Sequence, residues 1–163
     1  MPSFDVISEV DLQEVDNAVN QTSKEISQRF DFRGGKSKIE WDKTTKKIKI
    51  LADDELKLRS ITQILEQKFA KRQVDLACLK YGKTEPGSMG VLKQDVDLKT
   101  GLEKEEAKKI TALVKESKIK VSAEIQDDKV RISGKKIDDL QAIQQKLRNG
   151  NLGFPLQFVN QRS

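Results

Sequence analysis

The sequence contains no histidine and a single cysteine, Cys78, and these scarcities exclude several classes of protein. Without histidine, the chain lacks the commonest general base and the commonest zinc ligand. One cysteine forms no disulfide within the chain. Cys78 also follows Val74 and Leu76 in an alternating pattern that is typical of a strand with a buried side chain. We therefore predict a protein with no catalytic residues, no metal site and no cofactor.

Long apolar segments are missing as well. No stretch approaches the roughly 18 apolar residues that a membrane-spanning helix requires. Near the N-terminus, Asp5, Glu9 and Asp11 interrupt any apolar run of the kind found in signal peptides. We expect a cytoplasmic protein with no membrane partner.

The chain has only a modest excess of positive over negative charge. The chain has 31 Lys and Arg against 26 Asp and Glu, a formal net charge of +5. This balance favours anionic partners but is weaker than in proteins dedicated to clamping DNA. Charges as interspersed as these commonly form solvated faces.

The most informative feature that is present is an internal repeat. Ile48 aligns with Val130 and Ile50 with Ile132, an offset of 82 residues. The same offset aligns a series of apolar residues at helical spacing, Leu58, Ile61 and Leu65, with Leu140, Ile143 and Leu147. Alternating and helical spacings thus recur in the same order, which predicts a duplicated α/β unit.

The pattern of each half predicts a strand, a helix, two strands, a helix and a strand, in this order. In the first half we predict strands at 3–6, 36–41, 47–51 and 74–78, a helix starting with a capping box at Asp11 and Glu14, and a helix over 54–71. In the second half we predict strands at 91–98, 119–125, 130–133 and 156–159, with a helix after a capping box at Thr100 and Glu103 and another carrying Leu140. This order predicts an α+β protein, a tandem duplication of two ferredoxin-like β-α-β-β-α-β units with antiparallel sheets and helices on one sheet face. The segment 81–87, rich in turn residues, separates the halves.

The other sheet face is expected to carry cations. If the alternating isoleucines face the helices, a set of basic residues faces away: Lys38, Lys47, Lys49, Lys120, Lys129 and Arg131. Two interpretations remain open. The face could bind phosphates, or these could be ordinary solubilising residues diluted by Glu40, Ser122 and Glu124. The central strands lack the aromatic residues with which RNA-recognition motifs stack on bases.

One connection breaks the repeat. The stretch from Val19 to Ile39 is nine residues longer than its counterpart from Ile110 to Val121, and it contains the run Arg29-Phe30-Asp31-Phe32-Arg33-Gly34-Gly35-Lys36. Arginine can pair with phosphate, glycine lets backbone amides approach an anion, and phenylalanine can stack on a base. Alternatively, the two phenylalanines fill the corner between helix and strand. Phe30 continues the apolar stripe of the preceding helix, so we expect it to be packed in the core, and we favour a functional role for Arg33.

Several separate segments resemble the bacterial YajQ family: residues 3–11, 29–34, 118–126, 130–135 and 155–160. The resemblance spans essentially the whole chain. It implies two ferredoxin-like domains that exchange their first strands, one formed by residues 13–101 and the other by residues 1–12 with 102–163. Proteins of this family are described as nucleotide-binding, with GTP, tRNA and cyclic di-GMP as proposed ligands, and no settled catalytic activity accompanies the resemblance.

Together these observations predict a non-catalytic nucleotide-binding protein of regulatory role, with a ligand of the cyclic di-GMP or GTP class held between the units or on the basic sheet face. The candidate ligand-binding residues are Phe32, Arg33, Lys36, Lys49, Arg131 and Lys135, with Phe32 stacking on a base. The alternative is an RNA-binding (tRNA) module, or an adaptor for a transcription regulator, that acts through the basic sheet face. The least favoured hypothesis is a metal-dependent phosphodiesterase that uses the aspartate clusters at 53–54, 127–128 and 138–139.

Overall fold

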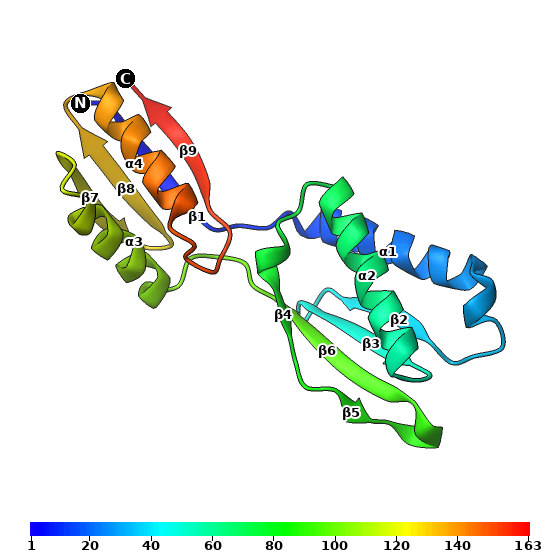
Figure 1. The fold of residues 1–163 in the computed structure, drawn as a ribbon. Coiled ribbons are helices and arrows are strands. Elements are labelled where there is room, and N and C mark those ends of the chain that lie inside the picture. The colour runs from blue at the N-terminus through cyan, green and yellow to red at the C-terminus, as the bar shows by residue number, and fades with distance from the viewer. The chain divides into compact units, whose positions relative to one another are not determined.

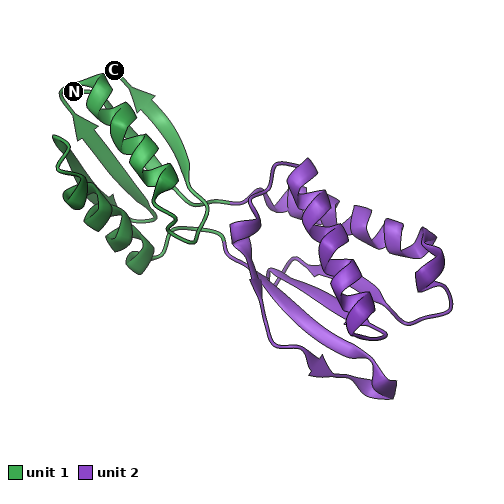
Figure 2. Cartoon of the chain, viewed as in Figure 1, with its two compact units in different colours: residues 1–9, 100–163 green, residues 10–99 purple.

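A computed structural model describes residues 1–163 and shows an α+β fold with four α-helices and two antiparallel sheets (Figure 1). The chain forms two compact units, one made of residues 1–9 and 100–163 and the other of residues 10–99 (Figure 2). We call them the C-terminal unit and the N-terminal unit. Each contains two helices and one sheet, which confirms the predicted duplication.

The N-terminal unit holds a sheet in the order β2-β3-β6-β4, with the short β5 also paired to β6. Its elements are α1 (Leu12–Gln28), the 3-10 turn η1 (Phe30–Phe32), β2 (Lys38–Asp42), β3 (Lys47–Ala52), α2 (Glu55–Lys71), η2 (Leu76–Cys78), β4 (Leu79–Tyr81), β5 (Glu85–Pro86), η3 (Ser88–Gly90) and β6 (Leu92–Leu98).

The C-terminal unit holds a four-stranded sheet in the order β7-β8-β1-β9. Its elements are β1 (Ser3–Ile7), α3 (Lys104–Ser117), β7 (Val121–Gln126), β8 (Lys129–Gly134), α4 (Ile137–Asn149) and β9 (Gln157–Arg162).

The two units exchange their first strands. β1 precedes α1 in the sequence, yet it pairs with β8 and β9 of the C-terminal unit. β6 precedes α3, yet it pairs with β3 and β4 of the N-terminal unit. The exchange follows the burial of side chains, because Phe4 and Val6 lie in the core of the C-terminal unit and Val96 and Leu98 in that of the N-terminal unit.

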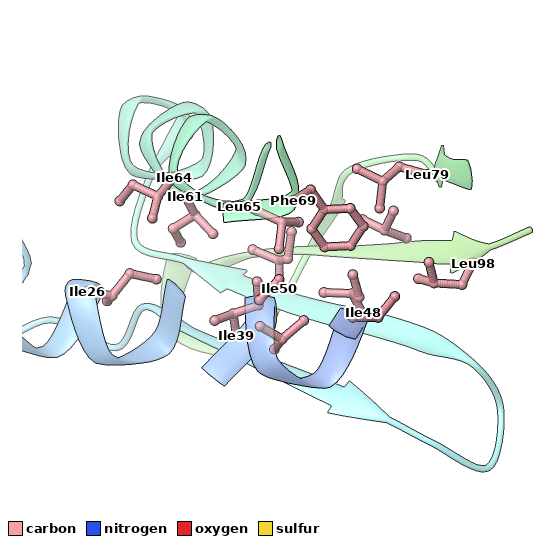
Figure 3. Close-up of a cluster of buried hydrophobic side chains, with 14 of the residues drawn as sticks. Ile26, Ile39, Ile48, Ile50, Ile61, Ile64, Leu65, Phe69, Leu79 and Leu98 are labelled. Carbon is pink, nitrogen blue, oxygen red and sulfur yellow. The ribbon is translucent and has the colours of Figure 1, made fainter. Parts of the chain in front are cut away.

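Alternation along the strands separates a buried sheet face from an exposed one. In the N-terminal unit Ile48 and Ile50 of β3 point into a core filled by Ile61, Leu65 and Phe69 of α2 (Figure 3). Their neighbour Lys49 is exposed on the other face. The predicted orientation of this strand is therefore confirmed, and the exposed face is called the open face below.

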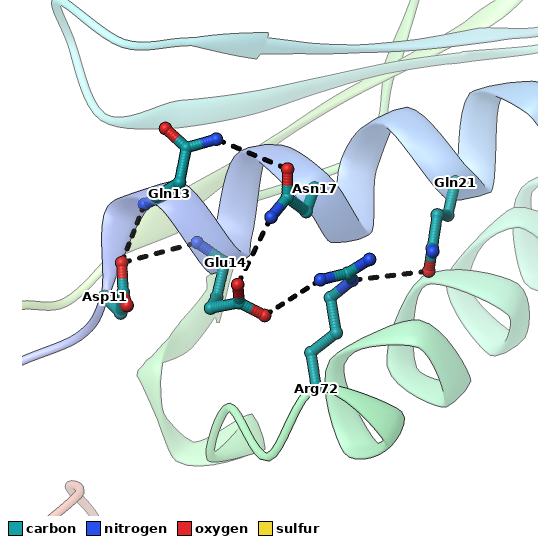
Figure 4. Close-up of polar contacts among 6 residues, drawn as sticks. All are labelled: Asp11, Gln13, Glu14, Asn17, Gln21 and Arg72. Carbon is teal, nitrogen blue, oxygen red and sulfur yellow. Dashed lines mark hydrogen bonds and ion pairs between the residues drawn. The ribbon is translucent and has the colours of Figure 1, made fainter.

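Polar contacts fix the start of α1 and join it to α2 (Figure 4). The Asp11 carboxylate accepts hydrogen bonds from the backbone N–H groups of Gln13 and Glu14, at 3.0 and 3.4 Å, so the predicted helix start is confirmed. The predicted capping box differs, because the Glu14 carboxylate accepts instead from Arg72 Nη1, at 3.0 Å, at the end of α2. Arg72 Nε also reaches Gln21 Oε1, at 3.4 Å.

Two predicted boundaries are wrong. The strand placed at 74–78 begins only at Leu79, because the Asp75 carboxylate accepts from the Ala77 N–H at 2.9 Å and turns the chain into η2. The capping box placed at Thr100 and Glu103 lies three residues later, where the Glu103 N–H donates to the Glu106 carboxylate at 2.9 Å. In both places a local side-chain bond overrides the pattern that we read from the sequence.

The predicted packing of Phe30 is also wrong. Phe30 is 82% exposed, whereas Phe32 is 6% exposed and belongs to the core. The reason is that α1 ends at Gln28, so Phe30 no longer continues the helical stripe of Ile26, and the following 3-10 turn carries Phe32 into the corner instead.

Candidate functional site

A groove of about 410 Å³ lies on the open face of the N-terminal unit. Its lining comes from β2, β3, β6 and the segment between β4 and β5: Lys38, Glu40, Lys49, Ile50, Leu51, Gly82, Lys83, Glu85, Lys93, Gln94 and Asp95. The strand register arranges the floor in two rows. Lys49 lies opposite Glu40 and Asp95, and Leu51 lies opposite Lys38 and Lys93.

The segment after β4 forms one wall of the groove, which gives the turn-rich region of the sequence a structural role. The Gly82 N–H donates to the Asp95 carbonyl at 2.9 Å, and Gln94 Nε2 donates to the Gly82 carbonyl at 2.9 Å. A Cβ on Gly82 would lie 2.8 Å from the Asp95 carbonyl oxygen. Glycine is therefore required for the segment to lie this close to β6.

The groove carries four lysines and three acids, and the lysines differ in how they are paired. Lys38 lies 3.5 Å from Glu40, and Lys49 lies 3.5 Å from Asp42. Lys83 and Lys93 are exposed, and neither has a carboxylate within 4.0 Å. Exposed pairs at such distances exchange readily for another anion. The groove can therefore offer all four cations to phosphate groups.

The loop containing Gly34 and Gly35 holds an anion, but one from the protein itself. The Lys36 N–H donates to Asp53 Oδ1 at 2.8 Å, and the Ser37 hydroxyl donates to Oδ2 at 2.7 Å. The Asp53 N–H in turn donates to Ser37 Oγ at 3.1 Å. The hydrogen bond from the Lys36 backbone, followed by that from Ser37, holds the pKa of Asp53 below its ordinary value. These donors are engaged and do not form a vacant phosphate site.

Gly35→Ala should destabilise the protein by about 1–2 kcal/mol, because a Cβ there would lie 2.3 Å from Asp53 Oδ2 and would displace a carboxylate held by several hydrogen bonds. Urea denaturation of the single variant measures the cost. In an Asp53→Ala background, the same substitution should be close to neutral, since the displaced group is gone. An equal cost in both backgrounds would show that the contact with Asp53 is not the cause.

The two phenylalanines of the run 29–36, called the insertion below, lie in surroundings that differ from those predicted. Arg29 and Lys57 lie 5.5 and 5.7 Å from the centre of the buried Phe32 ring. Phe32 is 6% exposed and packs in the core, so its ring is not available for a base to stack on, and the proposed stacking role has no geometric support. Arg33 is exposed, has no ion pair, and lies 5.6 Å from the centre of the exposed Phe30 ring. Lys36 Nζ lies 3.0 Å from Met89 Sδ.

The open face of the C-terminal unit centres on Asp5, a residue that the sequence reading missed. Its carboxylate is 2% exposed and lies 3.0 Å from Arg131 Nε, 2.9 Å from Asn160 Nδ2 and 3.5 Å from Lys129 Nζ. Burial raises the pKa of Asp5, but the bonds from Arg131 and Asn160 and the nearby positive charges outweigh it, and the net pKa lies below its ordinary value. Arg131 is thus committed to a partner within its own sheet.

The candidates from the sequence fall in different places. Only Lys49 lines the groove. Arg33 and Lys36 belong to the insertion of the same unit, whereas Arg131 and Lys135 belong to the C-terminal unit. The sequence reading missed Lys83, Lys93 and Asp95. Alternation on β6 places Lys93 and Asp95 on one face, but only the pairing of β6 with β3 sets them beside Lys49.

No helix in the structure combines the length and apolar character needed to cross a membrane.

Comparison with known proteins identifies the family. A family described as "Nucleotide-binding protein YajQ-like" matches residues 2–162. Among curated relatives, "Nucleotide-binding protein" of Geotalea uraniireducens is 50% identical over 162 residues, 99% of each chain. Proteins of the same name from Oleidesulfovibrio alaskensis and Carboxydothermus hydrogenoformans are each 51% identical, over 163 residues (100% of each chain) and over 160 residues (98% of this chain and 97% of the relative). The chain therefore belongs to the YajQ-like family.

Proposed function

We propose that this protein binds an anionic nucleotide of the cyclic di-GMP or GTP class in the groove of the N-terminal unit, without catalysing a reaction, and that binding serves regulation. The names of the relatives support nucleotide binding. The choice of site rests on the pair of exposed, unpaired lysines, Lys83 and Lys93, which line the same groove as Lys38 and Lys49.

The chemistry of the lining supports binding rather than turnover. Ammonium groups attract phosphate oxygens, and the side chain of Leu51 offers an apolar floor between Lys38 and Lys93. The lining contains no histidine, cysteine or aromatic ring. Affinity should therefore depend mainly on the phosphates and should fall as salt rises.

The groove is a better site than the open face of the C-terminal unit. Lys49 and Arg131 occupy equivalent positions on β3 and β8, but the partner of Lys49, at 3.5 Å, is 29% exposed, whereas that of Arg131, at 3.0 Å, is 2% exposed. Taking Arg131 from Asp5 would leave a buried carboxylate with Lys129, at 3.5 Å, as its only cation and without the hydrogen bond from Arg131, which is costly. Lys49 can turn to a ligand at little cost.

Calorimetric titration with cyclic di-GMP, GTP and ATP tests the proposal. Lys93→Ala should weaken binding of the tightest of these ligands about 10-fold, because a charge-assisted bond to phosphate is lost. Lys47→Ala, on the same open face but outside the groove lining, should change it less than about 3-fold. Binding no tighter than millimolar for every nucleotide would refute the proposal, and equal effects of the two variants would refute the site.

RNA binding is the second candidate, and a specific observation favours it. In the C-terminal unit, Val121 pairs with Gly134, which sets the exposed and unpaired Lys120 and Lys135 at the same end of the β7–β8 hairpin. Such a cluster suits a phosphate backbone. If tRNA is the ligand, the logarithm of its affinity should fall steeply and linearly with the logarithm of salt concentration, and Lys135→Ala should reduce that slope. A tRNA affinity that is independent of salt would contradict this candidate.

A further inference from the structure

The groove contains a carboxylate that an anion-binding site does not need. Asp95 projects from β6 into a groove with four lysines, is exposed, and has no cation within 4.0 Å. Its register partner is Lys49, yet the Lys49 ammonium lies beside Asp42 instead. An unpaired negative charge weakens the attraction of the site for phosphate unless the ligand also brings hydrogen-bond donors.

Because the fold is duplicated, the C-terminal unit has an acid at the position equivalent to Asp95, and that acid has a structural role. In the N-terminal unit the register forms an acid–cation–acid row of Glu40, Lys49 and Asp95. In the C-terminal unit the equivalent row is Glu124, Arg131 and Asp5. There the acid on the exchanged strand, Asp5, is buried and bonded to three side chains. Asp95 is its counterpart without partners, so a structural role of the kind that Asp5 has does not explain it.

Gly82 places the groove wall directly beside Asp95. Its N–H donates to the Asp95 carbonyl at 2.9 Å, and a Cβ there would lie 2.8 Å from that oxygen. The row containing Lys38, Leu51 and Lys93 lies two residues along the strands, a separation of about 7 Å. Phosphates held by Lys38 and Lys93 would thus leave room for a sugar before the base reaches Asp95.

We propose that Asp95 reads the base of the bound nucleotide by accepting hydrogen bonds from its N–H groups, which makes it the residue that sets specificity for guanine. This inference rests on the proposed function. Guanine presents two adjacent donors, N1–H and the N2 amino group, which match the two oxygens of one carboxylate. Hypoxanthine lacks the amino group, and adenine presents one donor beside an acceptor, which repels a carboxylate.

Titration of the full chain with GMP, IMP and AMP at one fixed salt concentration tests this role. The wild-type protein should bind GMP about 10-fold more tightly than IMP or AMP, because only guanine adds a second charge-assisted bond, from its N2 amino group. Asp95→Asn should weaken GMP binding about 10-fold and strengthen AMP binding about 2-fold, since it removes a negative charge near the phosphates. Changes in opposite directions cannot arise from a damaged fold. Asp97→Asn is the matched control, on the same strand and face but outside the groove lining, and it should leave the preference for GMP intact.

Two results would overturn the inference: a wild-type protein that binds the three nucleotides equally, or an Asp95→Asn variant that keeps the preference for GMP. In either case nucleotide binding itself would still stand. If none of the three binds and GTP and cyclic di-GMP do not bind either, the proposed function fails, and the inference fails with it.

Discussion

Removal of residues 1–9 should unfold the C-terminal unit and leave the sheet of the N-terminal unit intact. β1 lies between β8 and β9, so its loss separates the two strands that it joins. The deletion also removes Phe4 and Val6, which are 1% and 0% exposed. Burial of two such side chains contributes about 3–6 kcal/mol, and the lost strand pairings add to this, which is a large part of the stability of a small domain. All strands of the N-terminal sheet lie within residues 10–99.

Amide NMR spectra of the truncated protein measure this outcome. Signals from residues 10–99 should stay dispersed, whereas those from residues 100–163 should collapse into the range of unfolded chains. A chain lacking only Met1, which precedes β1, should give the wild-type spectrum. Dispersed signals throughout residues 100–163 in the truncated protein would contradict the exchange of strands.

Asp5→Ala should destabilise the C-terminal unit by about 2–4 kcal/mol. The substitution leaves Arg131, Lys129 and Asn160 without their shared partner in the middle of the sheet. The estimate is lower than for fully buried ion pairs because the two cations are 28% and 31% exposed and can regain water. Asp97→Ala, whose side chain is 64% exposed and 3.9 Å from Lys47, should cost less than about 0.5 kcal/mol. Urea denaturation followed by circular dichroism measures both.

The contribution of Asp5 should depend on pH in a defined direction. Its pKa in the folded protein is lower than its ordinary value, so the folded state favours the charged carboxylate. The stability that it adds is fully present above the unfolded pKa of about 3.9 and is lost as the pH falls through the lower folded value. The difference in stability between wild type and Asp5→Ala should therefore be constant from about pH 7 to 5 and shrink below about pH 4. A difference that grows on acidification would contradict the assigned charge state.

The order and orientation of the strands were predictable because the apolar residues that alternate in the sequence are the ones that are buried in the structure. Ile48 and Ile50 alternate with lysines, and the same pattern recurs at Val130 and Ile132, so strand orientation follows from the sequence. Local chemistry was harder to read. By its position in the sequence, Phe30 continues the apolar stripe of α1. The helix ends two residues earlier, however, and no pattern in the sequence marks that end. The exchange of β1 and β6 was predicted only from the resemblance to a known family. The periodicity of apolar residues shows which residues form strands but not which strands pair.

The candidate site was less predictable than the fold. Lys49 could be placed on the open face from alternation alone, and the groove contains it. Lys83 could not be found this way, because it belongs to a wall whose position depends on the close approach of Gly82 to β6. Arg131 has the residue type expected of a phosphate ligand, yet Asp5, distant in sequence, already occupies it. Whether a cation such as Arg131 is free for a ligand or already bound to a carboxylate of the protein can be decided only when the pairing of the strands is known.

An amide NMR titration of the full chain with GTP and with cyclic di-GMP tests most directly whether the groove binds nucleotides. We expect the largest shifts on residues lining the groove, in particular Lys49, Leu51, Gly82, Lys93 and Asp95, with small shifts around Arg131. Largest shifts on residues 129–135, or no shifts with either nucleotide at millimolar concentration, would contradict it.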